Sequence, residues 1–253
     1  MNWTAVVCAM LLFFSLDAQA VVALAGTRLV FEGRYQEATI ELSNPGDAPV
    51  LIQAWLKDAR AEPVIPADLP FVVTPHLAQL PGRGRQTLRI LYEGVGMPSD
   101  RESMLHLYVL EVPRRSEARQ QLSIAVRQRI NVFYRPKGLP GDPAEAAQRV
   151  AWQWTAEHRS ALWVRNPTPF HVSLHNLAIN GIEVVEDLML GPLSQRALAL
   201  PAGLHREPAS GHLSFKALTD YGGQRDFCGP ISSSEPFNAR LQTPGAHSSV
   251  RKC

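Results

Sequence analysis

The chain has 253 residues, 45% of them hydrophobic and 19% charged, which is the composition of a globular protein rather than a disordered one. Its formal net charge is only +2, so it lacks the overall positive field with which nucleic-acid-binding proteins attract their partners. Twenty prolines and 17 glycines favour many short strands and turns over long helices.

Residues 1–20 have the pattern of a secretory signal. An apolar run at 5–16 precedes Ala-Gln-Ala at 18–20, the small-x-small sequence typical of a signal-peptidase site. The run is short for a membrane span, and no later stretch is longer. We predict cleavage after Ala20 and export without a stable membrane anchor. An uncleaved N-terminal anchor is the alternative.

The first half of the exported chain predicts a β-sandwich. Runs of alternating polar and apolar residues recur between turn sequences such as Asn-Pro-Gly-Asp and Pro-Gly-Arg-Gly. The expected strands are RLVFEG (28–33), ATIELSN (38–44), PVLIQAWLKD (49–58), FVVTP (71–75), QTLRILYEG (86–94), MLHLYVLEV (104–112) and the apolar part of LSIAVRQRINVFYRP (122–136). Seven such strands in roughly 115 residues are typical of an immunoglobulin-like sandwich.

The second half predicts a smaller sandwich after a break rich in Gly and Pro at 137–148. Its expected strands are RVAWQWTAE (149–157), SALWVRNP (160–167), HVSLHNLAIN (171–180), QRALALP (195–201) and GHLSFKALTD (211–220). The fold class is therefore all-β, with two immunoglobulin-like β-sandwich domains. The predicted bounds are 1–20 for the signal peptide, 21–138 for the N-terminal domain, 139–148 for the linker, 149–231 for the C-terminal domain and 232–253 for a tail, loose unless its last cysteine is tethered.

Three cysteines are present, and Cys8 leaves with the signal peptide. Cys228 and Cys253 then meet an oxidising compartment, where a disulfide between them is expected and two unpaired thiols are the alternative. Two cysteines without CxxC spacing do not predict a metal site.

We find no sequence signature of an enzyme. The patterns GxSxG, HExxH, GxxxxGK[ST] and GxGxxG are all absent from the chain. His171 and His175 would lie about 13 Å apart on one strand face, too far to share a metal, so we interpret both as surface residues. His106, within a strand, is interpreted as structural. No catalytic residue and no metal ligand is predicted.

The last strand of the first half changes character along its length. Leu122, Ile124 and Val126 alternate with small residues, and Arg127 and Arg129 follow directly. One interpretation is a core strand that ends at a solvated rim. The other is an edge strand that presents its apolar row to another chain. The residues alone favour the core strand.

With the two predicted sandwiches and the export signal, the sequence resembles the periplasmic pilus chaperones of the chaperone–usher pathway, the PapD-like family. The resemblance covers most of the exported chain and is strongest at 26–136. It rests on GTRLVFEG (26–33), ELSNPGDAPVLIQAWL (41–56), FVVTPHLAQLPGRGRQTLRI (71–90), DRESMLHLYVLEVPRRSE (100–117), RINVFYRP (129–136) and, more weakly, LTDYGG (218–223).

The resemblance implies a periplasmic chaperone whose two domains meet in an L shape. Such a chaperone binds a pilin subunit one-to-one, lends it the last strand of its first domain and delivers it to an outer-membrane usher. Chaperone–pilin pairs are the standard example of this β-augmentation. Leu122, Ile124 and Val126 would be the donor-strand residues. No cofactor, metal or enzymatic activity is implied.

The family binds the subunit's terminal carboxylate with an Arg and a Lys. The Arg position corresponds to Arg28, but the Lys position is Asn131, which can hydrogen-bond without supplying charge. Arg129, two residues earlier on the same face, could supply the charge. These residues have the opposite parity to Leu122, Ile124 and Val126, so a twist or bulge is required between the two groups if both face the subunit.

Glu102, Arg135 and Asp220 correspond to the family's interdomain ion pairs, with three independent surface charges as the alternative. The short segment at 111–121 resembles that of the short F–G loop subclass. Two other functions remain as alternatives: a pilus subunit or adhesin, and an exported β-sandwich hydrolase or carbohydrate-binding protein.

Overall fold

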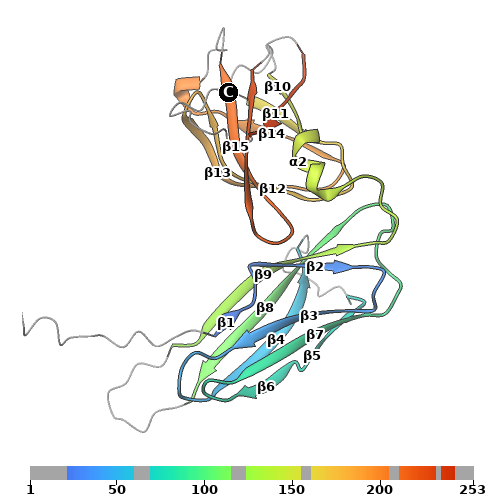
Figure 1. Cartoon of the computed structure of the whole chain (residues 1–253), viewed down its shortest axis with the longest axis vertical. Coiled ribbons are helices and arrows are strands. Elements are labelled where there is room, and N and C mark those ends of the chain that lie inside the picture. The colour runs from blue at the N-terminus through green and yellow to red at the C-terminus, as the bar shows by residue number, and fades with distance from the viewer. Residues whose placement is uncertain are drawn as a thin grey trace, which may run out of the picture.

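The computed structural model shows two β-sandwiches that meet at a bend (Figure 1). It describes residues 22–59, 69–114, 124–154, 161–204, 211–231 and 235–242. The predicted signal peptide lies outside these residues. Within the described part of the chain, no helix has the length and apolar character needed to cross a membrane.

The N-terminal sandwich packs a four-stranded sheet, β1-β3-β7-β5, against a five-stranded sheet, β2-β9-β8-β4-β6. Its strands are β1 (Ala23–Leu24), β2 (Arg28–Glu32), β3 (Glu37–Ser43), β4 (Val50–Asp58), β5 (Phe71–Thr74), β6 (Leu77–Leu80), β7 (Arg85–Tyr92), β8 (Ser103–Pro113) and β9 (Val126–Arg135). Burial alternates along β8 residue by residue, as the period of a strand with one core face requires.

An aromatic cluster in this core holds β2 against β9. The Phe31 ring is fully buried, with its centroid 5.7 Å from that of Phe71 and 5.8 Å from that of Tyr134. Burial and a hydrogen bond with Tyr92 raise the pKa of Tyr134 to about 12. Each such buried aromatic side chain contributes about 1.5–3 kcal/mol of hydrophobic stabilisation. The cluster therefore fixes the strand that begins with Arg28.

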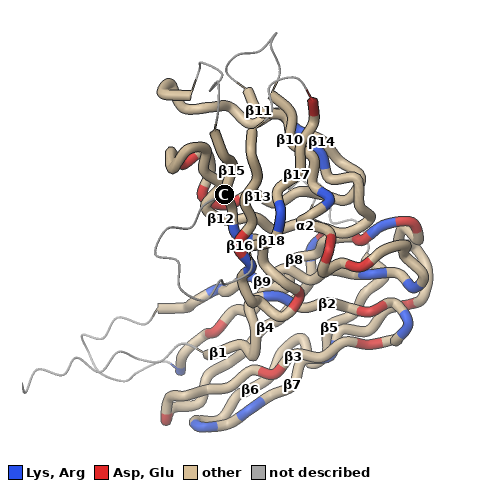
Figure 2. The backbone as a smooth tube through the Cα atoms, turned by 45° about the horizontal axis from the view of Figure 1, so that its top comes forward, with Lys and Arg blue, Asp and Glu red and all other residues tan. Residues whose placement is uncertain are grey.

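Strands β3 and β7 carry residues of both charges, coloured blue and red along the tube (Figure 2). Arg85 pairs with Glu41 at 3.3 Å and Arg89 pairs with Glu37, all with exposed side chains. Such exposed pairs contribute about 0–1 kcal/mol each. These exposed pairs give no sign of a binding surface.

The C-terminal sandwich packs β14-β11-β10-β17 against β13-β12-β15-β16-β18. Its elements are β10 (Ala151–Trp154), β11 (Ala161–Asn166), β12 (Val172–Ile179), β13 (Ile182–Leu190), β14 (Ser194–Ala199), η2 (Ala202–Leu204), β15 (His212–Leu218), β16 (Gln224–Pro230), β17 (Phe237–Asn238) and β18 (Arg240–Leu241). The core is built around the rings of Trp152, Phe215 and Phe227. The fold class is thus as predicted, with two all-β sandwiches.

The segment predicted as a linker carries two short helical turns, η1 (Pro143–Glu145) and α2 (Ala146–Arg149). The Asp142 carboxylate accepts a hydrogen bond from the Ala144 N–H at 2.8 Å and starts the first turn. Ala146 and Ala147 are buried in the C-terminal core. The second half of this segment is therefore packed against the C-terminal sandwich.

The sequence pattern missed several strands. In β13 the exposed and buried positions do not alternate, and β16 has three consecutive buried residues, so neither shows the expected period. The tail is expected to be loose unless Cys253 is tethered, but residues 235–242 form part of the C-terminal sandwich. There β17 pairs with β10, β18 pairs with β16, and Phe237 and Ala239 are buried.

Candidate functional site: the open edge of β9 and the interdomain cleft

Strand β9 is covered on both edges along its second half and on one edge along its first half. β2 pairs with it in parallel, from Arg28 opposite Asn131 to Glu32 opposite Arg135. β8 pairs with its other edge from Val126 to Tyr134. In the part of the chain that the structure describes, no strand pairs with the β2-side edge of Val126–Ile130. Free backbone groups along this open edge are a template for a further strand.

Two of the predicted donor-strand residues lie at the start of this open edge. Ile124 precedes β9 and is 63% exposed, whereas Val126 is half-buried and opposite Glu111 of β8. Leu122 lies outside the described residues. The structure therefore leaves an apolar side chain in solvent at the point where the open edge begins.

The β8–β9 register shows no β-bulge within Val126–Tyr134. The pairing of β9 with β8 runs through these residues without a register shift. Val126 therefore points to the opposite face of the sheet from Arg129 and Asn131. Ile124 lies before the first β8–β9 pair, so the pairing does not determine which face its side chain points to.

The predicted anchor residues lie on one face of the five-stranded sheet. Arg28 of β2 is paired with Asn131 of β9, which is paired on its other side with His106 of β8. Paired residues point to the same face, so these three side chains form a row across the strands. Arg129 lies on the same face, opposite Tyr108 and two residue pairs along the ladder from Asn131.

Arg28 keeps part of its donor capacity unused. Its guanidinium carbon lies 5.7 Å from the centroid of the Phe133 ring, in a cation–π arrangement. Its Nε is buried and has no hydrogen-bond partner among the described residues. Burial lowers the pKa of Arg28, and the charge of Asp220 opposes this effect. A partly desolvated guanidinium is suited to receive a carboxylate.

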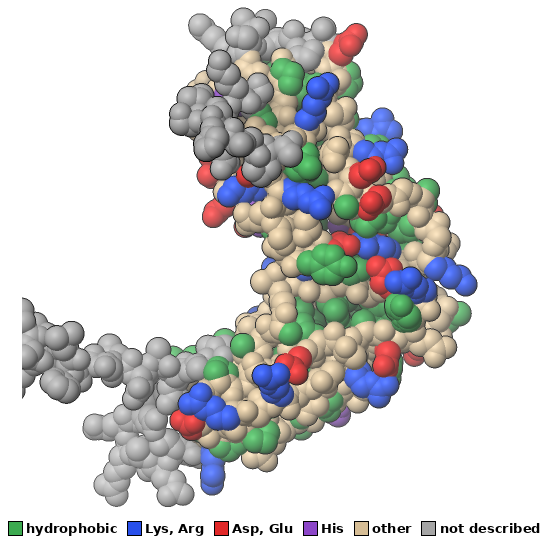
Figure 3. All heavy atoms as spheres, in the orientation of Figure 1, with side chains coloured by type: hydrophobic (Ala, Val, Ile, Leu, Met, Phe, Trp, Pro, Cys, Tyr) green, Lys and Arg blue, Asp and Glu red, His purple; other side chains and the backbone are tan. Residues whose placement is uncertain are grey.

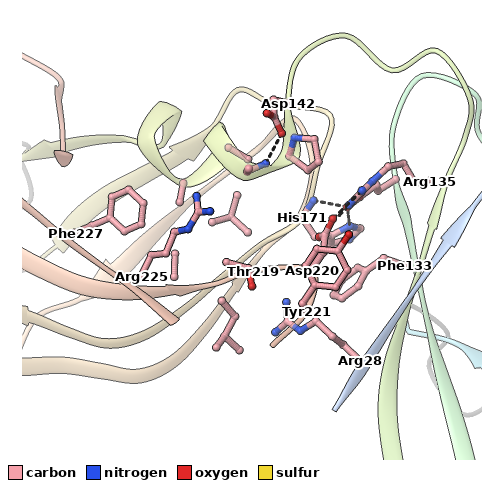
Figure 4. Close-up of a pocket in the computed structure, with 18 of the residues that line it drawn as sticks. Arg28, Phe133, Arg135, Asp142, His171, Thr219, Asp220, Tyr221, Arg225 and Phe227 are labelled. Atoms are coloured by element: carbon pink, nitrogen blue, oxygen red, sulfur yellow. Dashed lines mark hydrogen bonds and ion pairs between the residues drawn. The ribbon is translucent and has the colours of Figure 1, made fainter. Parts of the chain in front are cut away.

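A cleft of about 340 Å³ lies between the two sandwiches (Figure 4). Its N-terminal wall includes Arg28 and Phe133, and its C-terminal wall includes Asp220 and Tyr221. The space-filling view shows the hollow between the sandwiches open to solvent (Figure 3). Arg28 thus borders both the cleft and the open edge of β9.

Arg135 brings the three predicted interdomain residues together. Its Nε lies 2.7 Å from Oε1 of Glu102, and its Nη1 and Nη2 lie 2.8 and 3.1 Å from the carboxylate oxygens of Asp220. Burial lowers the pKa of Arg135, but the hydrogen bonds and charges of Asp220 and Glu102 outweigh it and raise the pKa above its ordinary value. One guanidinium therefore joins a carboxylate from each sandwich.

His171 belongs to the same cluster, which the sequence did not reveal. Oε2 of Glu102 accepts a hydrogen bond from the His171 backbone N–H at 2.7 Å and lies 3.2 Å from Nδ1 of its ring. The Glu102 N–H donates to the carbonyl of Pro169 at 2.9 Å. The interpretation of His171 as a surface residue is wrong, because its side chain is only 9% exposed. A lone histidine before a strand carries no signal of such a contact.

The remaining candidate residues carry no further chemistry. Cys228 is buried and disulfide-bonded, and its expected partner Cys253 lies outside the described residues. Within the described ranges, no three of the His, Cys, Asp and Glu side chains are placed so that they could hold a metal ion.

We expect Arg135→Met to lower the free energy of unfolding by about 3–5 kcal/mol, because it leaves the Glu102 carboxylate buried without its cation. Glu102→Gln in the same chain should recover part of this loss, since the amide keeps an acceptor for the His171 N–H without a charge. Urea unfolding measures both effects. Arg85→Met, which removes an exposed pair, is the control and should cost less than about 1 kcal/mol. Equal losses for the two Arg variants would show that the cluster contributes nothing.

The stability of the protein should fall in acid in a way that depends on His106. Burial and the charge of Arg129 lower the pKa of His106, against the opposing effects of Asn131 and Asp58. The unfolded chain therefore binds the proton at a higher pH than the folded one, and stability is lost as the pH falls through and below about 6.5.

The measurement is the urea midpoint at about pH 7.5 and about pH 5. His106→Gln should show a smaller difference between the two midpoints than the wild type. His212→Gln, at an exposed position of β15, should keep the wild-type difference. If His106→Gln also keeps it, His106 does not titrate as described.

Comparison with known proteins agrees with this geometry. Residues 21–140 match the family described as pili and flagellar-assembly chaperone, PapD N-terminal domain, and residues 145–228 match pili assembly chaperone PapD, C-terminal domain. The chaperone protein FimB/FhaD of Bordetella pertussis is 38% identical over 227 residues, which are 85% of this chain and 90% of that protein.

Two solved structures share the fold and the sequence pattern. The YadV chaperone, named a probable fimbrial chaperone of Escherichia coli, is 30% identical with a TM-score of 0.69, over 83% of this chain and 99% of that one. SafB of Salmonella enterica, solved in complex with the SafA pilin, is 27% identical with a TM-score of 0.69, over 88% and 96%. The chain belongs to the PapD-like family of pilus assembly chaperones.

Proposed function

We propose that this chain binds a pilin subunit along the open edge of β9, holds the subunit's C-terminal carboxylate on Arg28 and delivers it to an outer-membrane usher. The observation that carries the proposal is the short pairing of β2 with β9. It leaves Val126–Ile130 open on one edge and places Arg28 where that edge ends. SafB, a relative with the same fold, was solved with its pilin bound.

The physical need for such a chaperone follows from the guest, by which we mean the bound pilin subunit. A sandwich that lacks its last strand exposes an apolar groove and unpaired backbone groups, both of which promote aggregation. A strand lent by the chaperone pairs those groups, while Leu122, Ile124 and Val126 fill the groove. Each side chain contributes about 1.5–3 kcal/mol if it becomes fully buried, before ordering costs are subtracted.

The carboxylate anchor completes the site. Arg28 supplies charge from β2, and Asn131 and Arg129 follow on the neighbouring strand. Asn131, opposite His106 in the ladder, supplies no charge. Arg28 is therefore the main electrostatic contact, and Arg129 adds charge two residue pairs away along β9.

The ion pairs of Arg135 with Glu102 and Asp220 serve to fix the angle between the two domains. A buried ion pair adds little net stability, but it can select one geometry over others. A fixed angle keeps the C-terminal wall of the cleft opposite Arg28. We place the two domains at 21–138 and 149–231, and we add residues 235–242 to the second domain because β17 and β18 pair with its strands.

The site of action in this proposal is the periplasm, reached after cleavage of residues 1–20. The disulfide of Cys228 is consistent with an oxidising compartment. The function needs binding surfaces rather than a reaction, so the chain acts without a cofactor. A pilus subunit, the alternative from the sequence, requires one incomplete sandwich, whereas this chain forms two.

Arg28→Ala should abolish accumulation of the cognate pilin in a co-expression experiment while the variant remains folded. The arginine is half-buried at a strand end, so its loss removes the anchor and leaves the aromatic core in place. The measurement is the yield of the one-to-one complex, with circular dichroism as the folding check. Arg34→Ala, at an exposed position in the turn after β2, is the matched control. Unchanged pilin yield with Arg28→Ala would refute the anchor.

Asn131→Lys should tighten pilin binding about fivefold, because a charge-assisted hydrogen bond to a carboxylate exceeds a neutral one by about 1 kcal/mol. Titration of the chaperone with pilin released from the complex measures the change. Arg129→Ala is the companion variant. If Asn131→Lys has no effect and Arg129→Ala loses affinity, the second carboxylate contact belongs to Arg129 rather than to position 131.

A further inference from the structure

Tyr221 is an aromatic residue that the fold holds in solvent. It is 99% exposed, at the turn between β15 and β16, on the C-terminal wall of the cleft. Figure 4 shows its side chain near those of Asp220 and Arg28. A single exposed aromatic on a convex surface is ordinary. In a cleft that receives another chain, the same ring offers apolar area that binding can bury.

The turn that carries Tyr221 is rigid. The Thr219 N–H donates to the Gly223 carbonyl at 2.8 Å, and the Gly222 N–H donates to the Thr219 carbonyl at 3.0 Å. Gly222 has a φ of +79°, a conformation that favours glycine. A rigid turn presents its aromatic side chain with little entropy left to lose on binding.

The residue before Tyr221 fixes the turn from the other side. Both carboxylate oxygens of Asp220 are bound to the guanidinium of Arg135, which belongs to the N-terminal sandwich. The position of Tyr221 relative to Arg28 is therefore set by the same contacts that join the domains. The ring and the anchor cation form one preorganised pair.

Arg28 and Tyr221 together suit the C-terminal residue of a bound chain, which carries both a carboxylate and a side chain. Arg28, above the Phe133 ring, lines the cleft and supplies the positive charge for a carboxylate. The side chain next to a C-terminal carboxylate belongs to the last residue of the ligand, and Tyr221 and the half-buried Leu218 provide an apolar wall for it.

We propose that Tyr221 is a specificity-determining residue that packs against the last side chain of the guest and favours an apolar, above all an aromatic, C-terminal residue. The inference rests on the proposed function, because it requires Arg28 to hold the guest's carboxylate. It extends that function from recognition of any C-terminus to selection among C-termini.

The test uses short synthetic peptides that share one sequence of alternating apolar residues. One peptide ends in Phe and a second in Gly, both with a free C-terminal carboxylate. The third ends in Phe with an amidated C-terminus. Calorimetric titration of the whole chaperone gives the dissociation constants. The wild type should bind the Phe peptide about tenfold more tightly than the Gly peptide. This ratio of dissociation constants is the one expected when a single aromatic contact buries apolar surface.

Tyr221→Ala should remove this preference while changing the affinity for the Gly peptide less than about twofold, and Tyr221→Phe should retain it. Tyr35→Ala, an aromatic that is 56% exposed and does not line the cleft, should leave the preference intact. An unchanged ratio in Tyr221→Ala, with binding still dependent on Arg28, overturns the inference alone. If Arg28→Ala or the C-terminal amide leaves peptide binding unchanged, the anchor of the proposed function fails, and the inference fails with it.

Discussion

The parallel pairing of β2 with only the second half of β9 determines what this protein can bind and where. Five residue pairs, from Arg28 opposite Asn131 to Glu32 opposite Arg135, close that part of the edge. In the first half of β9, residues Val126–Ile130 pair with β8 on one edge, and no described strand pairs with their other edge. The cation thus lies where the free edge ends, and the buried Phe31 in the same strand keeps it there. A longer β2 would cover the edge, and a shorter one would release Arg28.

The second constraint is the charge cluster at the bend. Arg135 contacts Glu102 from its own sandwich and Asp220 from the other, and the backbone of His171 donates to Glu102. Such a cluster costs desolvation, so its value lies in selecting one domain angle rather than in added stability. The angle matters because the C-terminal wall, with Tyr221, lies across the cleft from Arg28, the proposed anchor. The angle between the domains at the bend therefore sets the distance between the two walls of the cleft.

Much of the fold could be predicted from the sequence, since strands with one buried face show the period of two. β8 is the clearest case, because burial alternates at every residue up to its last one, Pro113. β13 and β16 were missed because their burial does not alternate. The nearness of Arg28 to Asn131 could not be read from periodicity. It depends on a parallel pairing between segments about 100 residues apart, and only the family resemblance suggested it. The contact of His171 with Glu102 had no sequence signal at all.

The central claim is that the guest extends the sheet at the open edge of β9, and hydrogen–deuterium exchange of the chaperone with and without bound pilin tests it most directly. The account predicts slower exchange in the complex for those amides of Val126–Ile130 that do not pair with β8. Exchange in β5, an edge strand of the opposite sheet, should stay the same. Protection elsewhere, with Val126–Ile130 exchanging as in the free protein, would contradict it.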